Sequence, residues 1–251
     1  MDDLLIENTT VYGHEPSRIH GGEDSKEGEF KFFVSLAKNR TLLCGGAIVD
    51  ERHVITAAHC FANFTQTKIN KTVVISGITD FQIGGKKHSI EKIFSHPNFD
   101  ETNPTSTNDI AIVKTKQKIQ LGDNQPKSAP ARSVALASGP IESGKNVTAI
   151  GFGMTESQPN SLSKTLKKIS VRTLAISKCQ KCLNNKLGDG QFCTISPIGK
   201  GTCVGDSGGP VINSEGKLVG IISWGLLYAL GDPDIHTNVS YYMDWITNII
   251  N

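Results

Sequence analysis

Three short motifs place a histidine, an aspartate and a serine where nucleophilic chemistry could use them. His59 follows the apolar residues Ala57 and Ala58, Asp109 precedes an apolar run, and Ser207 stands in Gly-Asp-Ser-Gly-Gly-Pro (residues 205–210). A serine hydroxyl is a poor nucleophile at neutral pH, so it needs a neighbouring base, which a third group must orient. A single histidine or aspartate is more often structural, but the glycine-rich run rarely arises by chance. Together the three motifs predict catalysis through Ser207.

These motifs resemble those of the chymotrypsin/trypsin family of serine endopeptidases, and the likeness runs from Ile19 to the C-terminal end. It includes Cys-Gly-Gly at 44–46, Gly-Phe-Gly at 151–153 and Ser-Trp-Gly at 223–225. The resemblance implies that His59 is the general base and later the acid, that Asp109 orients it and stays ionised, and that Ser207 attacks the scissile carbonyl. We expect no cofactor and no metal.

The resemblance also assigns the groups that hold the substrate. Attack places negative charge on the carbonyl oxygen, and the N–H groups of Gly205 and Ser207 would form the oxyanion hole that stabilises it. Gly205 suits this position because glycine adopts backbone angles that are closed to other residues. Ser223 would donate to Asp109, and the backbone of Ser223, Trp224 and Gly225 would pair with the substrate as an added strand.

A second expectation is that the chain is made as a zymogen. Arg18-Ile19-His20-Gly21-Gly22 resembles the activation site of the family, so residues 1–18 are predicted to be a propeptide and 19–251 the peptidase domain. Cleavage after Arg18 would create an ammonium group at Ile19, and Asp206 would turn inward to pair with it. Activity should then fall at alkaline pH, as the Ile19 amine loses its proton.

The primary specificity pocket departs from the trypsin pattern. The family places the pocket floor six residues before the nucleophile, where this chain has Gly201, followed by Thr202. Aligning Pro233 with a family proline puts Asp234 where a pocket glycine usually stands. We therefore expect either a chymotrypsin-like pocket or a mixed preference for large apolar and basic residues, unless Asp234 lies in a remodelled loop that faces solvent.

Six cysteines are consistent with an oxidising compartment, because no Cys-x-x-Cys pair recurs at zinc-finger spacing. The resemblance implies two disulfide bonds, Cys44–Cys60 and Cys179–Cys193. The usual partner of Cys203 is missing from the loop at 226–232. Cys182 and Cys203 are therefore either joined in an unusual bond or free.

The elements that must position these residues are mostly strands. Short apolar runs alternate with Gly, Pro, Asn and Ser clusters, which favours an all-β sandwich or barrel. The predicted strands are 32–36, 47–49, 53–56, 72–76, 110–114, 147–151, 166–172, 209–212 and 218–224. Apolar residues three and four apart from Tyr241 to Ile250 predict a terminal helix, and 176–184 a shorter one. With the resemblance, this predicts a trypsin-like fold of two six-stranded antiparallel β-barrels, about 19–125 and about 126–251, the second carrying the terminal helix.

Composition limits the partners. The 251 residues carry a net charge of +2, which gives no strong field for binding nucleic acid or a membrane surface. No uncharged stretch is long enough to span a membrane as a helix. Asn-x-Ser/Thr sites occur at Asn8, Asn39, Asn63, Asn70, Asn146 and Asn238. They predict a secreted, glycosylated protein, because only the secretory route glycosylates them.

We expect a monomer that meets polypeptide substrates, an Arg-specific activating protease and protein protease inhibitors, and neither nucleic acid nor membrane. Two other functions remain open from the sequence. One is a catalytically weak or inactive, protease-like binding protein. The other is hydrolysis of small esters, which uses the same acyl-transfer groups.

Overall fold

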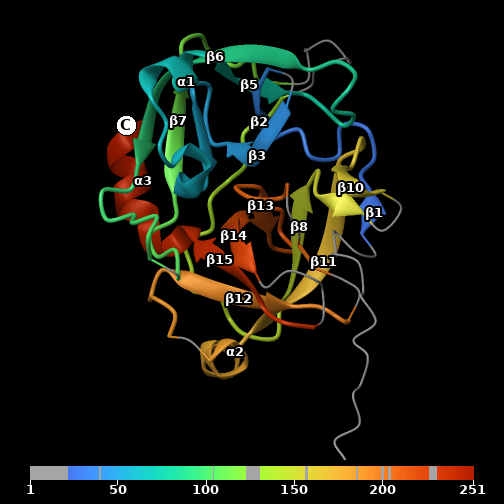
Figure 1. Cartoon of the computed structure of the whole chain (residues 1–251), viewed down its shortest axis with the longest axis vertical. Coiled ribbons are helices and arrows are strands. Elements are labelled where there is room, and N and C mark those ends of the chain that lie inside the picture. The colour runs from blue at the N-terminus through green and yellow to red at the C-terminus, as the bar shows by residue number, and fades with distance from the viewer. Residues whose placement is uncertain are drawn as a thin grey trace, which may run out of the picture.

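Six strands close into a first barrel in the computed structural model of this protein (Figure 1). The structure describes residues 22–39, 41–103, 105–122, 131–155, 158–184, 186–198, 201–202, 205–225 and 231–251. The barrel is antiparallel, with strand order β2-β3-β4-β7-β6-β5, and β5 pairs with β2 to close it. Its strands are β2 (Phe33–Lys38), β3 (Thr41–Ile48), β4 (His53–Thr56), β5 (Thr72–Ser76), β6 (Lys86–Ser95) and β7 (Ala111–Thr115).

A second antiparallel barrel follows in the chain and lies below the first in Figure 1. Its order is β11-β12-β15-β14-β13-β8, and pairing of β8 with β11 closes it. The strands are β8 (Asn146–Gly151), β11 (Lys167–Leu174), β12 (Gln191–Ile195), β13 (Pro210–Ile212), β14 (Leu218–Gly225) and β15 (Asp234–Asn238). Two short additions accompany it: β1 (Glu23–Asp24) pairs with β11, and β9 (Met154–Thr155) pairs with β10 (Gln158–Leu162). The prediction of two six-stranded barrels is confirmed.

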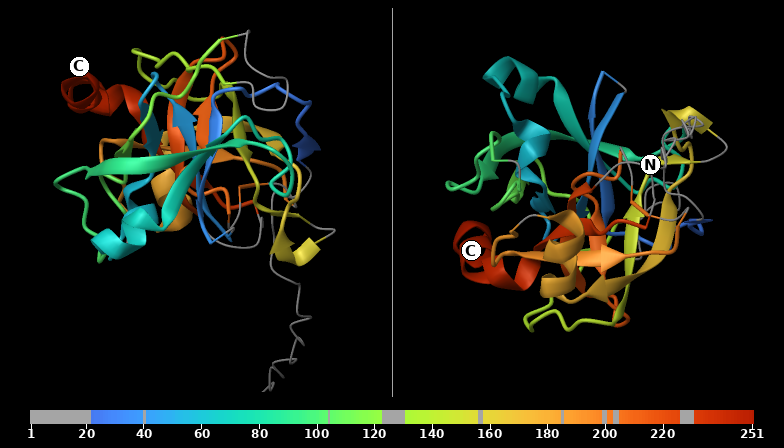
Figure 2. Two further views of the ribbon diagram at one scale, coloured as in Figure 1. Left: turned by 90° about the horizontal axis from the view of Figure 1, so that it is seen from above. Right: turned by 60° about the horizontal axis from the view of Figure 1, so that its bottom comes forward.

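Helices are few and lie outside the barrels (Figure 2). They are the 3-10 helices η1 (Ala58–Phe61) and η2 (Val239–Tyr242) and the α-helices α1 (Gln66–Asn70), α2 (Ile176–Leu183) and α3 (Met243–Ile250). None of the helices in the described ranges is long and apolar enough to cross a membrane.

The terminal helix covers the first barrel although it follows the second in the chain. In Figure 1, α3 lies beside β7. The rings of Tyr242 and Trp245 each lie 5.2 Å from the His96 ring, measured between centroids. Tyr242 and Ile246 are buried in a core that also contains Ile112 of β7 and Ile221 of β14. This core therefore joins the two barrels.

Three barrel strands, β6, β12 and β15, are absent from the sequence prediction, as are the short additions β1, β9 and β10. Strand β6 carries five charged or histidine residues, and only His88 and Ile90 are buried along it. Strands β12 and β15 read Gln-Phe-Cys-Thr-Ile and Asp-Ile-His-Thr-Asn, with polar residues inside the protein. Propensity and alternation miss such strands because the tertiary environment determines them.

Candidate active site

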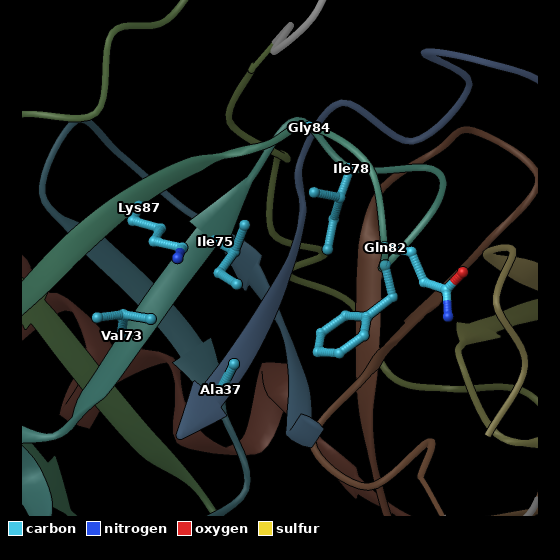
Figure 3. A pocket seen from close by; sticks show the side chains of 8 residues that line it. Ala37, Val73, Ile75, Ile78, Gln82, Gly84 and Lys87 are labelled. Carbon is cyan, nitrogen blue, oxygen red and sulfur yellow. The ribbon is translucent and has the colours of Figure 1, made fainter. Parts of the chain in front are cut away.

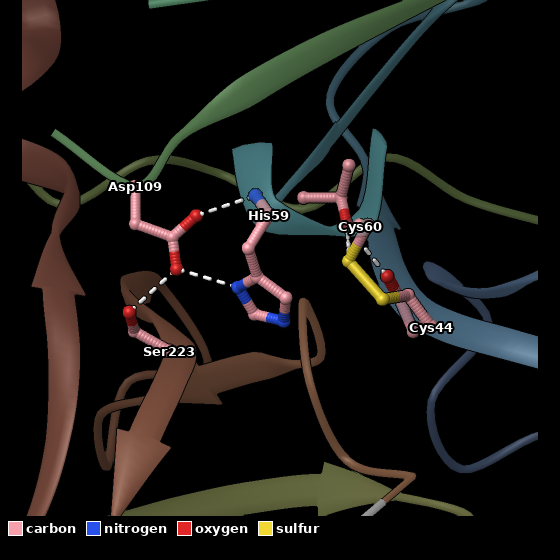
Figure 4. The surroundings of a disulfide bond; sticks show 7 residues. Cys44, His59, Cys60, Asp109 and Ser223 are labelled. Carbon is pink, nitrogen blue, oxygen red and sulfur yellow. Dashed lines mark hydrogen bonds and ion pairs between the residues drawn. A yellow bond between two sulfur atoms is a disulfide. The ribbon is translucent and has the colours of Figure 1, made fainter. Parts of the chain in front are cut away.

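The carboxylate of Asp109 accepts three hydrogen bonds (Figure 4). It is 0% exposed. Its Oδ2 accepts from His59 Nδ1 at 2.7 Å and from Ser223 Oγ at 2.6 Å, and its Oδ1 accepts from the backbone N–H of His59 at 2.8 Å. Three donors from two barrels therefore hold this buried charge, as burial of a carboxylate requires.

The loop that carries Asp109 is anchored to the second barrel. Thr237 of β15 donates from Oγ1 to the Asp109 carbonyl at 2.7 Å, and the Tyr242 hydroxyl donates to Asn108 Oδ1 at 3.1 Å. The indole N–H of Trp224 donates to the carbonyl of Thr105 at 2.9 Å. Asn108 has φ 58°, a left-handed conformation that turns the chain into β7 and that asparagine tolerates better than most residues. The position of Asp109 thus depends on contacts from strands far along the chain.

His59 lies in η1, next to the disulfide bond that joins Cys44 to Cys60 (Figure 4). Because Nδ1 donates to Asp109, Nε2 is left with its lone pair and can accept a proton. Burial lowers the pKa of His59, but the hydrogen bond to Asp109 and the negative charge of that carboxylate outweigh burial, so the pKa lies above its usual value. The imidazole is therefore a stronger base than a free histidine.

Ser207 follows a tight turn that brings the second barrel against β3 and η1. Its carbonyl accepts from the N–H of Gly45 at 2.8 Å. A Cβ on the next residue, Gly208, would lie 2.2 Å from Thr56 Oγ1 and 3.2 Å from Cys60 Sγ, so the chain passes directly beside the His59 turn. In this described region no hydrogen bond joins the Ser207 hydroxyl to the imidazole, a bond that is often long before substrate binds.

The two residues before Ser207 are a glycine with a left-handed backbone and a buried aspartate. Gly205 has φ 99°, which a side chain would strain. Asp206 is 0% exposed, and its Oδ1 accepts from the N–H of Gly153 at 2.7 Å. A Cβ on Gly151 would lie 2.0 Å from the same oxygen. The Gly-Phe-Gly run therefore leaves space for a buried carboxylate beside Ser207.

Asp234 is buried, 6% exposed, at the start of β15, where it pairs with Gly225 of β14. Its Oδ2 accepts from the N–H of Thr202 at 3.0 Å, and a Cβ on Gly225 would lie 2.7 Å from its Oδ1. Gly201 beside Thr202 is also buried. Burial raises the pKa of Asp234 to about 6, against the opposing hydrogen bonds from Thr202. Asp234 thus contacts the segments that the family resemblance assigns to substrate binding.

His236 stands two residues after Asp234 and on the same face of β15, and its replacement of a tyrosine usual nearby in the family is a departure that bears on specificity. His236 is 0% exposed, and its Nε2 lies 2.7 Å from Thr194 Oγ1. Its Nδ1 has no partner within the described residues, and burial lowers its pKa to about 3. His236 is therefore neutral at physiological pH.

The cysteine predictions can be compared with the structure in part. Cys44–Cys60 and Cys179–Cys193 are disulfide-bonded, as expected, and Cys182 is free and exposed. Cys203 lies outside the described residues, as do Arg18, Ile19, Asn8 and the loop at 226–230.

One cluster of potential metal ligands occurs in the described part of the chain, formed by Cys44, His59 and Cys60. Its two sulfurs are bonded to each other, so they offer no thiolate.

Two closed barrels, with a hydrogen-bonded aspartate and histidine between them and a glycine-flanked serine alongside, define the class of two-barrel serine peptidases. The model of the trypsin family matches residues 19–246. A trypsin of Phaedon cochleariae is 31% identical over 236 residues, 91% of this chain and 86% of that protein. Phenoloxidase-activating factor 3 of Holotrichia diomphalia is 30% identical over 98% of this chain and 76% of that protein.

The fold has a solved counterpart in neuropsin, a serine protease expressed in the limbic system of mouse brain. The TM-score is 0.82 at 27% identity, covering 92% of this chain and 99% of the other. The chain belongs to the trypsin family. It is a serine endopeptidase, a hydrolase whose substrates are polypeptides.

Proposed function

We propose that this protein cleaves peptide bonds through an acyl-enzyme formed on Ser207, with His59 and Asp109 completing the catalytic triad. The observation that carries the proposal is the buried Asp109 carboxylate, which holds His59 Nδ1 at 2.7 Å and so leaves Nε2 as the base. The Ser207 turn lies against the same helix, η1.

In the first step Nε2 of His59 takes the proton of the Ser207 hydroxyl while the oxygen attacks the scissile carbonyl carbon. The protonated imidazole gives that proton to the leaving amine as the carbon–nitrogen bond breaks. Water then repeats the sequence on the acyl-enzyme and releases the acid. Asp109 stays ionised throughout and stabilises the imidazolium.

The negative oxygen of each tetrahedral intermediate would be held by the N–H groups of Gly205 and Ser207. The φ of 99° at Gly205 supports this assignment, because it allows the backbone to curve around one point. The substrate backbone would pair with residues 223–225 at the end of β14, which favours peptides over small esters.

We also propose that the protein is secreted as a zymogen and that residues 1–18 are released by an Arg-specific protease. Support comes from the carboxylate of Asp206, which is buried in contact with Gly153 in the uncleaved chain, so a new ammonium group at Ile19 would pair with a carboxylate that has no need to turn inward. The name of one relative, a phenoloxidase-activating factor, favours a role outside digestion.

Four of the five described Asn-x-Ser/Thr sites, Asn39, Asn63, Asn70 and Asn146, are exposed, as glycosylation requires.

For specificity we propose a mixed preference, in which the pocket accepts large apolar residues and also lysine or arginine. Gly201 leaves the usual floor without a carboxylate. Asp234 supplies one from the wall instead, because its Oδ2 is 3.0 Å from the Thr202 nitrogen and its side chain adjoins Gly225. A basic substrate side chain would then be the counter-ion of a buried carboxylate.

The decisive test is to cleave the purified protein after Arg18 and react it with a fluorophosphonate probe, with the adduct located by peptide mass. We expect stoichiometric labelling of Ser207 after cleavage and none before. Ser207→Ala must abolish labelling, while the matched Ser170→Ala, at an exposed serine of β11, must retain it. No labelling after verified cleavage would refute catalysis and favour a protease-like binding protein. Equal labelling before cleavage would refute the zymogen alone.

A further inference from the structure

Two of the hollows in the described part of the chain lie on different barrels and differ in what surrounds them. The hollow on the first barrel has a volume of about 580 Å³ and is lined mainly by apolar side chains (Figure 3). The hollow on the second barrel has a volume of about 390 Å³. Its wall includes Asn146, the first residue of the Asn-x-Thr site at 146–148. A candidate glycosylation site and a concave surface therefore occur together on the second barrel.

Three segments of the second barrel enclose this space, which we call the Asn146 hollow. They are residues 137–142, the start of β8 at 146–147 and the turn at 213–217 between β13 and β14. Asn213 Oδ1 accepts from two backbone N–H groups of its own turn, at 3.0 and 2.9 Å. The N–H of Ala137 donates to the backbone of β14 at 2.9 Å. Both sides are thus held by the protein itself, and a ligand would not have to order them.

The charges that line the Asn146 hollow cancel. Lys145 Nζ lies 2.9 Å from Glu142 Oε2, and Lys217 Nζ lies 2.7 Å from Glu215 Oε2. All four side chains are exposed, so the two ion pairs contribute little to stability. They leave no net charge that would attract a charged partner. The hollow therefore suits a neutral ligand.

The remaining exposed surface of the hollow is partly apolar and partly hydroxylated. Pro140 is exposed, and Ile141 is half-buried against the core of the second barrel. Ser138 and Ser214 are exposed, and their hydroxyl groups can donate and accept hydrogen bonds. A sugar has the matching properties, because it carries apolar C–H faces between its hydroxyl groups. The volume also lies within the range of about 300–1,000 Å³ that small-molecule sites usually have.

Asn146 has a free side-chain amide at the edge of this surface. It is exposed, and within the described residues its side chain forms no hydrogen bond. Asn63 lines another hollow, but its Nδ2 already donates to both carboxylate oxygens of Glu101 at 3.0 Å. Asn70 lies in α1 on the first barrel, away from this hollow. Of these three sites, Asn146 is the one that combines an unengaged amide with the neutral hollow.

We infer that the Asn146 hollow holds the first N-acetylglucosamine of a glycan on Asn146 Nδ2, with the apolar face of the sugar on Pro140 and Ile141. Its polar groups would lie beside Ser138 and Ser214. The bond forms when Nδ2 displaces a lipid pyrophosphate from C1 of the sugar donor and loses one proton. The inference rests on the proposed secretion, because only the secretory route supplies this donor. It adds that the glycan covers the hollow and stabilises the fold around it.

The test uses the full chain with Ser207→Ala, secreted behind a signal peptide from eukaryotic cells that attach high-mannose glycans. Peptide mass gives the occupancy of each Asn-x-Ser/Thr site, and we expect Asn146 to be occupied. Endoglycosidase H then trims every glycan to its first sugar. This trimmed glycoprotein is compared with the same preparation of Asn146→Gln.

Two measurements report on the cover. Within the described residues no backbone N–H of 138–142 donates a hydrogen bond, so slow hydrogen exchange there requires a covering group. We expect exchange at 138–142 to be about 5-fold slower in the trimmed glycoprotein than in Asn146→Gln. The Tm should be about 3 °C higher, as for a contact of moderate strength in a domain of this size.

Two further variants separate the hollow from a general effect of glycans. Asn70→Gln removes the acceptor of an exposed site on the first barrel, and it should leave exchange at 138–142 within about 2-fold and Tm within about 1 °C. Ile141→Ser keeps the Asn146 acceptor but removes the apolar contact. In that background Asn146→Gln should lower Tm by less than half as much, because the two changes act on one interaction.

The outcomes also distinguish this inference from the function on which it rests. No glycan at any site would overturn both this inference and the expected glycosylation. Glycans at other sites with Asn146 unoccupied would overturn the inference alone. So would equal exchange and Tm with and without the Asn146 sugar, an equal effect of Asn70→Gln at 138–142, or simple addition of the Ile141→Ser and Asn146→Gln losses. Failure of Ser207 to react with a probe leaves the inference standing, since the test uses a chain without that serine.

Discussion

Two aspartate–histidine neighbourhoods of this protein are built from the same residue types and behave in opposite ways. In the first, Asp109 accepts three hydrogen bonds, and its charge raises the pKa of His59. In the second, burial raises the pKa of Asp234 to about 6 and lowers that of His236 to about 3. Burial alone therefore does not determine the charge of such groups; hydrogen-bond donors and neighbouring charges do.

The difference matches the two roles proposed for these residues. A catalytic group must be ready before the substrate arrives, so its charge is stabilised by fixed donors, as Asp109 is by donors from both barrels. A specificity group acts only when the substrate fills the site, so it can remain poorly compensated until a cationic side chain supplies the missing charge. We therefore expect substitutions in the two neighbourhoods to affect different measurements.

The largest expected effect is that of Asp109→Asn. The amide keeps the shape but stabilises the wrong tautomer of His59, so kcat should fall about 10⁴-fold for every substrate, the scale seen when a triad loses this carboxylate. Steady-state hydrolysis of one basic and one aromatic peptide substrate checks this. A loss confined to one substrate would show that Asp109 acts in specificity and would erase the contrast with Asp234.

Asp234→Gly should change selectivity instead of the rate common to all substrates. Removing the buried carboxylate should lower the ratio of kcat/KM for lysine over phenylalanine substrates roughly 10- to 100-fold, as for loss of a close charge pair. In the unmodified protein the same ratio should fall as pH drops through about 6, because the carboxyl becomes neutral. Asp232→Gly is the matched control. An unchanged ratio would place Asp234 outside the pocket.

The smallest expected effect is on stability. A carboxyl whose folded pKa is raised favours folding fully only below its unfolded pKa, and this contribution is lost as pH rises through about 6. Asp234→Asn should therefore stabilise the protein by about 1 to 3 kcal/mol near neutral pH and by little below about pH 4. Denaturant unfolding at both pH values measures it. Destabilisation near neutral pH would mean that the carboxylate is compensated in the folded state.

Much of the fold could be predicted from short apolar runs and motifs. The predicted strands at 53–56 and 72–76 have their observed bounds, and most others lie within a few residues of theirs. The sequence pattern did not predict β6, β12 and β15. Exposed charges in β6 and buried polar side chains in β12 and β15 break the alternation of apolar and polar residues by which strands are predicted. Those strands exist because neighbours in each barrel pair with both of their edges.

For the candidate site, local motifs predicted His59, Asp109 and Ser207, and the structure brings the turns that carry these three residues together. The supporting contacts were less accessible. Thr237 and Tyr242 act on the Asp109 loop from more than a hundred residues away, and their spacing carries no signal. Burial of Asp234 likewise follows from pairing with both β12 and β14, which no single segment predicts.

The placement of α3 and the Tyr242 contact also sets the order of assembly during synthesis. The first barrel is translated long before the segment that covers it. Its surface at His96 therefore stays uncovered until Tyr242 and Trp245 have been synthesised. Until then Asn108 lacks its tyrosine partner, and the adjoining Asp109 has neither Thr237 nor Ser223. A nascent chain of this protein therefore lacks the full set of contacts around Asp109, and the chemistry proposed for this site is delayed until both barrels and α3 have been made.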